Sequence, residues 1–219
     1  MSETNRKYAA MVESIDDCMR DMLAELKKHG IDENTMIIFT SDNGGLDRNG
    51  NPTENAPLRS GKGYCYEGGI RVPFLVRWPA AVPPGVVSDE PVSSIDLFPS
   101  ILQATGTQLP EDRPIDGLSL IRHLRSEATE SLGRESLFWH FPHYRHAPGP
   151  YSIIRKRNWK LIKFWEGIYE LYDLDKDLGE TKNLADLMPE IVRELEGELL
   201  ARLRRDEAKL PRTNPEYSK

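Results

Sequence analysis

Apolar residues recur every three or four positions near the start of the chain, and this spacing predicts a long amphipathic helix that Gly30 ends. The apolar stripe of this helix consists of Tyr8, Met11, Val12, Ile15, Cys18, Met19, Met22, Leu23 and Leu26. A short β-rich apolar run at 36–39 follows and predicts a buried strand. A helix that leads into a strand through a short loop is the repeating unit of α/β folds.

Further along, the run VPFLVRW at 72–78 predicts a second buried strand, and the pattern after Asp96 predicts a helix that Gly106 ends. A shorter helix is expected over 118–124. A polar stretch without a period, 127–134, then marks a change in composition. We therefore expect a first domain of α/β type at 1–130.

Short runs rich in aromatic and β-branched residues follow this boundary, at 137–141, 151–156, 159–164 and 169–174. Turn residues separate the runs, which predicts an antiparallel sheet of about four strands. A final helix begins at Pro189, where proline is harmless, and its apolar face carries Ile191, Leu195, Leu199 and Leu203. One long helix on a small antiparallel sheet predicts an α+β subdomain at 131–219.

Composition narrows the classes of function. The 219 residues carry a net charge of −6, which argues against a nucleic-acid partner because such a surface needs a basic patch. Lys62, with Arg59 and Arg71, forms the local cationic exception. No apolar run approaches the ~18 residues of a transmembrane helix and no signal peptide opens the chain, so we expect no membrane partner and assign no compartment. The two cysteines, Cys18 and Cys65, suggest no disulfide framework.

The long loop between the two predicted strands, 40–73, carries glycine, asparagine and proline in place of an apolar period. It begins with a carboxylate and an amide, Asp42 and Asn43, and later presents Lys62 between two glycines. Hard metal ions take oxygen ligands, and a lysine ammonium can hold a tetrahedral oxyanion. The loop is therefore a candidate metal and anion site, although Asp-Asn-Gly alone is also typical of a simple turn.

Three stretches of the chain resemble the second half of a sulfatase, a family of the alkaline phosphatase-like superfamily. They read SDNGG, LRSGKGYCYEGGIRVP and ELYDLDKDLGETKNLAD. The resemblance implies the last strands and helices of an alkaline phosphatase-like α/β sandwich at 1–130. It also implies a small α+β C-terminal subdomain at 131–219.

The resemblance assigns roles to several loop residues. It implies that Asp42 and Asn43 ligate a calcium ion and that Lys62 contacts the sulfate group. Calcium takes about six to eight oxygens, so two side chains make only part of a site, and in the family upstream aspartates supply the rest. Glu67 and Arg71 stand four residues apart, and we expect them to pair and brace the loop from behind the ligands.

Three histidines, His140, His143 and His146, stand three residues apart. This spacing fits no standard zinc pattern, and Pro142 argues against a helix that would place them on one face. They also fit a packing or surface role. Because the C-terminal subdomain of sulfatases borders the cleft, His140 or His143 is a candidate contact to the substrate or leaving group.

Sulfatases attack sulfur with a formylglycine made from the first residue of a C/S-x-P-S-R motif, and the chain contains no such motif. Covalent catalysis needs its activated nucleophile. We therefore expect a truncated sulfatase that is inactive alone, with the formylglycine in a missing N-terminal part. The expected substrate is an aryl or carbohydrate sulfate ester.

The missing part also predicts an uncovered apolar sheet edge, so we expect self-association or pairing with a separate N-terminal half. Two alternatives remain open. One is a phosphodiesterase or phosphonate hydrolase of the same superfamily, which shares the metal and oxyanion chemistry. The other is a non-catalytic binding or assembly remnant, which the absent nucleophile favours.

Overall fold

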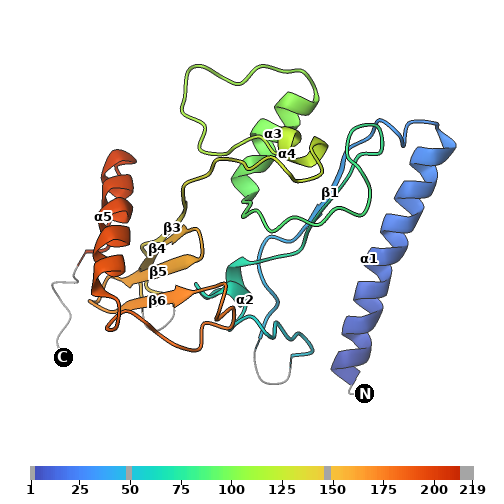
Figure 1. The fold of residues 1–219 in the computed structure, drawn as a ribbon. Helices are drawn as coiled ribbons and strands as arrows, with labels where there is room; N and C mark the ends of the chain where they lie inside the picture. The colour runs from blue at the N-terminus through green and yellow to red at the C-terminus, as the bar shows by residue number, and fades with distance from the viewer. Residues whose placement is uncertain (1–2, 48–50, 146–148, 213–219) are drawn as a thin grey trace. The chain divides into compact units, whose positions relative to one another are not determined.

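A computed structural model describes residues 3–47, 51–145 and 149–212 (Figure 1). Its elements, in chain order, are α1 Glu3–Lys28, β1 Ile37–Thr40, α2 Glu67–Ile70, β2 Phe74–Arg77, the 3₁₀ turn η1 Ser94–Asp96, α3 Leu97–Ala104, α4 Ile121–Arg125, β3 Leu137–Phe141, β4 Tyr151–Lys156, β5 Trp159–Phe164, β6 Tyr169–Asp173 and α5 Pro189–Arg205. This mixture of helices and strands matches the expected fold class. Within these ranges, no helix has the length and apolar character needed to cross a bilayer.

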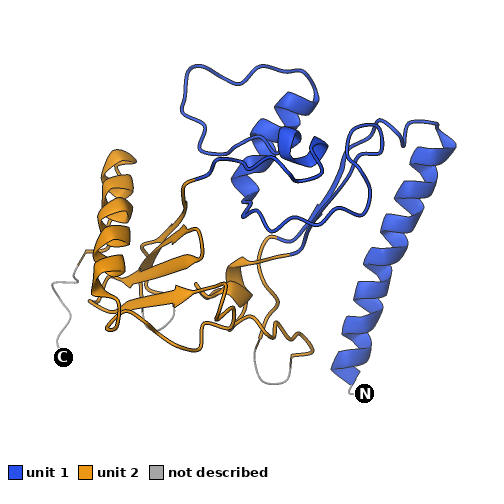
Figure 2. Ribbon diagram, viewed as in Figure 1, with its two compact units in different colours: residues 1–41, 73–134 blue, residues 42–72, 135–219 orange. Residues whose placement is uncertain are grey.

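The chain packs as two compact units (Figure 2). Unit 1 comprises residues 1–41 and 73–134, and unit 2 comprises residues 42–72 and 135–219. The break after residue 134 lies close to the predicted boundary at 130. The long loop, however, packs with the C-terminal sheet instead of with the strands that flank it in sequence, so the compact units differ from the predicted domains.

β1 and β2 form a two-stranded antiparallel sheet in unit 1, with Ile38 opposite Val76. The sequence predicted two buried strands, and this prediction is wrong in part. Phe39 and Leu75 are 38% and 59% exposed. A strand is buried on both faces only when further layers pack against it, and a two-stranded ribbon does not supply them.

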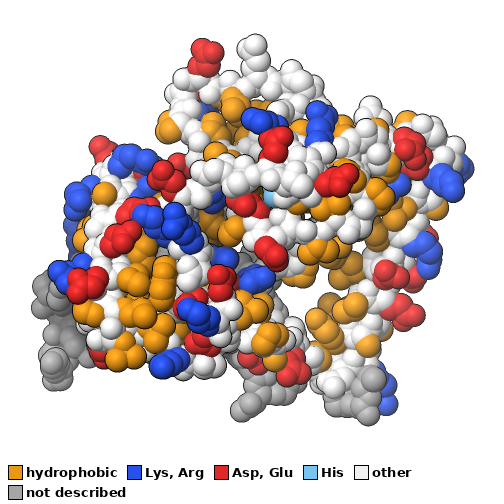
Figure 3. All heavy atoms as spheres, viewed as in Figure 1, with side chains coloured by type: hydrophobic (Ala, Val, Ile, Leu, Met, Phe, Trp, Pro, Cys, Tyr) orange, Lys and Arg blue, Asp and Glu red, His pale blue; other side chains and the backbone are white. Residues whose placement is uncertain are grey.

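Helix α1 confirms the predicted amphipathic helix and extends it to Glu3. Its apolar stripe is not buried: no residue of α1, all of whose residues are described, is buried. The exposed members of the stripe are Tyr8, Met11, Val12, Ile15, Cys18 and Met22, and apolar side chains line one side of the helix in Figure 3. Because amphipathic helices normally bury this face, α1 presents an uncovered apolar surface.

Unit 2 contains the predicted four-stranded sheet, in the order β3-β4-β5-β6 and antiparallel throughout. The predicted final helix is also confirmed, because α5 begins at Pro189 and buries Leu195, Leu199 and Leu203. Successive side chains along a strand point to opposite faces of the sheet. Here both faces are covered.

One face of the sheet packs against α5. This cluster contains Ile154, Leu161, Leu171, Ala185, Leu195, Leu199 and Leu203. The opposite face forms a second cluster of Cys65, Tyr66, Ile153, Ile162, Phe164, Tyr172 and Leu174. Because Cys65 and Tyr66 belong to the long loop, this loop serves as the second layer over the sheet.

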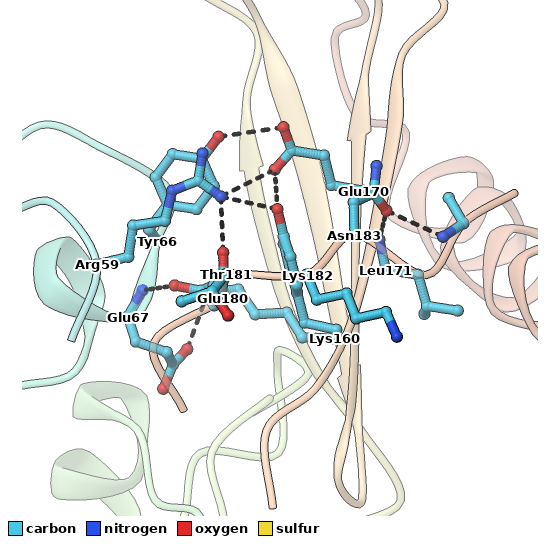
Figure 4. Close-up of polar contacts among 12 residues, drawn as sticks. Arg59, Tyr66, Glu67, Lys160, Glu170, Leu171, Glu180, Thr181, Lys182 and Asn183 are labelled. Atoms are coloured by element: carbon cyan, nitrogen blue, oxygen red, sulfur yellow. Dashed lines mark hydrogen bonds and ion pairs between the residues drawn. The ribbon is translucent and has the colours of Figure 1, made fainter. Parts of the chain in front are cut away.

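Lys160 on β5 lies beneath the loop with 0% exposure (Figure 4). Its Nζ donates to Glu67 Oε1 at 2.9 Å and to Glu180 Oε1 at 2.7 Å. The other carboxylate oxygen of Glu180 accepts the backbone N–H of Glu67 at 2.7 Å. A buried ion cluster of these three residues therefore joins the loop to the sheet, in addition to the apolar contacts.

Replacing Lys160 with methionine would leave two buried carboxylates without a cation between them. Breaking a buried ion pair by removing one partner costs about 3–5 kcal/mol, and we expect Lys160→Met to lower the free energy of unfolding of unit 2 by this amount. Urea unfolding measures the change. Lys182→Met, at an exposed lysine of the same unit, is the control and should stay within about 0.5 kcal/mol of the wild type. Equal stability of the two variants would contradict the role of the cluster.

The two thiols should differ sharply in reactivity. Cys65 is 3% exposed, and burial raises the pKa of its thiol to about 12, whereas Cys18 is exposed. Because the thiolate is the nucleophile, the folded chain at pH 8 should react with Ellman's reagent at Cys18 and not at Cys65. Thionitrobenzoate release before and after adding guanidinium measures this. The Cys18→Ser variant should release none until it unfolds, and rapid release from the folded variant would show that Cys65 is accessible.

Candidate active site

Direct backbone hydrogen bonds bring together the two ends of the loop that carry the candidate site residues. The N–H of Lys62 donates to the carbonyl of Gly45 at 2.9 Å, and the N–H of Gly44 donates to the carbonyl of Gly69 at 3.0 Å. The turn that starts at Asp42 is therefore held against the segment around Lys62. In the sequence, Asp42 and Lys62 are twenty positions apart.

Two glycines allow this close approach because neither has a side chain. A Cβ on Gly44 would lie 1.7 Å from the carbonyl oxygen of Gly68, and one on Gly61 would lie 2.2 Å from the carbonyl oxygen of Gly45. Contacts this short with backbone atoms exclude any larger residue. Gly63 has a φ of 94°, a left-handed conformation that favours glycine. The glycines beside Lys62 thus pack the two segments together and shape the turn.

Asp42 and Asn43 open the turn with one carboxylate and one amide, exposed and half-buried respectively. Their oxygens are hard donors of the kind that calcium prefers, so the donor chemistry fits that ion. Among the described residues, no three His, Cys, Asp or Glu side chains converge on one point. Two such donors would make up only part of a calcium ligand set.

Asn55 belongs to the site, and the sequence pattern did not indicate it. Its side-chain Oδ1 accepts the N–H of Gly45 at 3.1 Å, and its Nδ2 donates to the carbonyls of Gly45 at 2.9 Å and Ser60 at 3.0 Å. One half-buried amide thus contacts both the turn that starts at Asp42 and the segment around Lys62. An asparagine in a loop rich in glycine and asparagine carries no periodic signal by which to find it.

The three cations of the loop do not act as one patch. Lys62 is exposed, as an anion contact requires, and Arg71 is exposed as well. Arg59 instead turns toward the sheet, where it donates to the Tyr172 hydroxyl at 2.8 Å and lies 3.7 Å from the centre of the Tyr66 ring. Arg59 is therefore a tether between loop and sheet.

Glu67 supports the loop with a different partner from the one expected. The sequence suggested that it pairs with Arg71, whereas its carboxylate pairs with the buried Lys160 at 2.9 Å. The two loop residues are linked only by the turn of α2, in which the Arg71 N–H donates to the Glu67 carbonyl at 2.7 Å. The carboxylate points into the interface with β5, and this direction separates it from the exposed guanidinium.

Burial raises the pKa of several titratable groups behind the loop. Burial and the neighbouring carboxylate of Glu170 raise the pKa of Tyr66 and of Tyr172. Both hydroxyls donate to that carboxylate, at 3.2 Å and 2.7 Å (Figure 4). Burial also raises the pKa of Glu180, partly opposed by Lys160. These groups thus hold the loop in place through hydrogen bonds, and the tyrosines keep their protons at neutral pH.

The histidines lie in different surroundings. His140 on β3 has both ring nitrogens engaged: Nδ1 lies 2.7 Å from Ser152 Oγ and Nε2 lies 2.9 Å from the Lys209 carbonyl. This arrangement is that of a packing residue, so we retain only His143 as a candidate contact. His143 is exposed, with its ring edge-on to Phe141 at 5.0 Å. His146 lies outside the described residues.

This arrangement can hold an anion beside a metal ion. An exposed ammonium and two oxygen donors are carried on segments that share backbone hydrogen bonds. Behind them, apolar residues of the loop pack on the sheet. The serines and cysteines of the sequence lack the C/S-x-P-S-R context.

Comparison with known protein families gives two matches. The family described as Sulfatase matches residues 3–107. The family described as N-sulphoglucosamine sulphohydrolase, C-terminal, matches residues 60–208, which is more than half of the chain. The second match spans the lysine segment, the sheet and α5.

Individual relatives agree with this result. A curated protein named Sulfatase, from Formosa agariphila, is 39% identical over 199 residues, which cover 83% of this chain and 35% of that protein. The crystal structure of Ps i-CgsB in complex with k-i-k-neocarrahexaose is 28% identical with a TM-score of 0.81, over 92% of this chain and 44% of that one. A structure in complex with its substrate D-glucosamine-2-N,6-O-disulfate is 26% identical with a TM-score of 0.74, over 92% and 40%.

The chain thus spans less than half the length of these relatives. Its α/β elements, four-stranded sheet and final helix correspond to part of an alkaline phosphatase-like fold. The chain belongs to the sulfatase family, of which it covers the C-terminal portion.

Proposed function

We propose that this chain is the C-terminal part of a sulfatase that hydrolyses sulfate esters. In this proposal Lys62 contacts the sulfate group, and Asp42 and Asn43 supply part of a calcium site. The observation that carries it is the hydrogen bond from the Lys62 backbone to Gly45, because it holds the anion-contacting lysine against the turn of oxygen donors. Membership of the sulfatase family supports sulfate as the anion.

The roles of the residues follow from their chemistry. Lys62 places a compact positive charge against a tetrahedral oxyanion. Calcium, when bound, supplies Lewis-acid polarisation of the sulfate oxygens. We propose His143 as a contact to the leaving group, because it is exposed in the segment after β3. The formylglycine nucleophile is proposed to come from an upstream part of the enzyme.

The substrate class is proposed as a sulfated carbohydrate. A compared structure holds D-glucosamine-2-N,6-O-disulfate as its substrate, and its similarity covers 92% of this chain. Aryl sulfates remain the second class to assay. A phosphodiester or phosphonate would use the same metal and lysine chemistry, so bis(4-nitrophenyl) phosphate belongs in the same panel.

The chain alone should not hydrolyse 4-nitrophenyl sulfate or glucosamine-2-N,6-O-disulfate above the uncatalysed rate, because it contains no C/S-x-P-S-R motif. Adding an upstream sulfatase half with a matured formylglycine should produce activity that a calcium chelator removes. Lys62→Ala should lower kcat/KM of the mixture by about 10²–10³-fold, the typical cost of losing one group that stabilises transition-state charge.

Lys182→Ala is the control for that assay and should leave kcat/KM unchanged, because Lys182 is exposed and lies outside the lysine segment. Turnover by the unassisted chain would contradict the proposed division of the enzyme. Reconstituted activity that survives Lys62→Ala would contradict the sulfate contact. A preference for bis(4-nitrophenyl) phosphate over both sulfates would favour the phosphodiesterase alternative.

We also propose that the apolar stripe of α1 is covered by the upstream part of the enzyme, or by a second copy when that part is absent. Met11 is 65% exposed and Ile15 is 54% exposed on this stripe. Contiguous exposed apolar surface of this kind marks association sites. Sedimentation of the chain alone should therefore show mass increasing with concentration.

The double variant Met11→Lys, Ile15→Lys should shift that association toward monomer, because it places two cations on the stripe. The matched control Ala10→Lys, Ser14→Lys changes two exposed positions outside the stripe with the same spacing and the same change in charge, and should associate like the wild type. Wild-type chain that remains monomeric at high concentration would argue against this use of the stripe.

A further inference from the structure

Asn55 has an unusual set of contacts for a side chain in an irregular loop. Its amide oxygen accepts from Gly45 N–H, and its amide nitrogen donates to two carbonyls, those of Gly45 and Ser60. The distances are 3.1, 2.9 and 3.0 Å. The presence of one N–H and two carbonyls fixes which end of the amide is oxygen. The side chain thus pairs with Gly45 as a neighbouring strand would.

The two residues it touches lie next to the site on opposite sides. Gly45 is two positions after Asn43, and Ser60 is two positions before Lys62. Both segments lack helical or strand structure, so isolated backbone bonds such as that from Lys62 to Gly45, and not a strand ladder, join them. The Asn55 backbone is itself anchored, because its carbonyl accepts the N–H of Leu58 at 2.9 Å. The amide therefore bridges the segments from a fixed point.

The Gly45 carbonyl is a shared acceptor in this bridge. It accepts from Asn55 Nδ2 at 2.9 Å and from the Lys62 backbone N–H at 2.9 Å. A carbonyl oxygen has two lone pairs, so both bonds can form together. A displacement of Asn55 would therefore alter the acceptor to which Lys62 is bonded, in addition to releasing Ser60.

We infer that Asn55 is a positioning residue that holds the segment of Lys62 in register with the turn of Asp42 and Asn43. This inference rests on the proposed function in one respect, because the register aligns an anion contact with a metal site only if that function holds. The register itself is a property of this chain. Asparagine is required because the position needs one acceptor and two donors, which a carboxylate or an alkyl side chain does not provide.

Amide hydrogen exchange of the full 219-residue chain, followed by NMR, tests this inference. Asn55→Ala should lower the protection of the Gly45 and Lys62 amides at least tenfold at pH 7, with the amides of Ile153 and Ile162 unchanged as a folding reference. Asn183→Ala is the matched control, since Asn183 also accepts from a backbone N–H, at 2.9 Å, and donates to a carbonyl, at 3.0 Å, elsewhere in unit 2. It should leave the Gly45 and Lys62 amides at wild-type protection.

Asn55→Asp supplies a readout that general loosening of the loop would not produce. At pH 7 its carboxylate can still accept the Gly45 N–H but faces two carbonyls, so protection of the Lys62 amide should fall at least as far as in Asn55→Ala. A protonated carboxyl has one donor and one acceptor, so protection relative to wild type at the same pH should recover as pH falls through about 4. Recovery supports the bridge. Unchanged Lys62 protection in Asn55→Ala, or no recovery in Asn55→Asp, would overturn it.

Calcium chloride, added to the wild type in the same experiment, separates the two proposals. Calcium-dependent protection of the Asp42–Gly45 turn supports the proposed metal site. If the Asn55 variants behave as expected while calcium changes nothing, the positioning role stands and the calcium assignment of this chain fails. If calcium protects the turn but Asn55→Ala leaves Lys62 protected, the positioning role fails and the metal site stands.

Discussion

The buried contact between Lys160 and the carboxylates of Glu67 and Glu180 is the interaction on which the rest of the structure depends. It joins a loop without regular structure to a four-stranded sheet at a position with no access to water. A lysine placed there without partners would be strongly destabilising, so the sheet reaches this arrangement only with the loop docked. The cluster therefore specifies where the loop lies, whatever its net contribution to stability.

Docking of the loop explains why its glycines and polar groups are arranged as they are. With its far side packed on Ile153, Ile162 and Tyr172, the loop has only its near side for chemistry. Gly44 and Gly61 let separate segments of the loop backbone come into contact, because neighbouring carbonyls fill the space that their side chains would occupy. The exposed Lys62 thus projects from a layer that packs like a protein core, which is how precise placement is possible on a loop.

How far the sequence predicts this molecule depends on the range of the interactions involved. The sheet of unit 2 and helix α5 follow from local periodicity, and both were predicted with nearly correct bounds. Contacts within an irregular loop leave no periodic pattern, so Asn55 gave no signal. The contact of Lys160 with Glu67 joins residues far apart in sequence, so Lys160 gave no signal and Glu67 was paired with the wrong partner. The burial of β1 and β2 was overestimated. An apolar run indicates that a strand has apolar side chains to bury, but the described residues of unit 1 do not supply the layer that would cover them.

The two units differ in how well their apolar side chains are covered, and this difference bears on which part of the proposed enzyme needs a partner. In unit 2, both faces of the sheet are covered and the buried Lys160 is paired. Unit 1 leaves the stripe of α1 exposed, together with side chains such as Phe39 and Leu75 on its strands. Apolar surface of that kind needs a partner, whereas a self-contained layer does not. The proposed site, whose ligand set is itself partial, therefore lies on the unit whose sheet is covered on both faces, and the exposed apolar surface lies on the other unit.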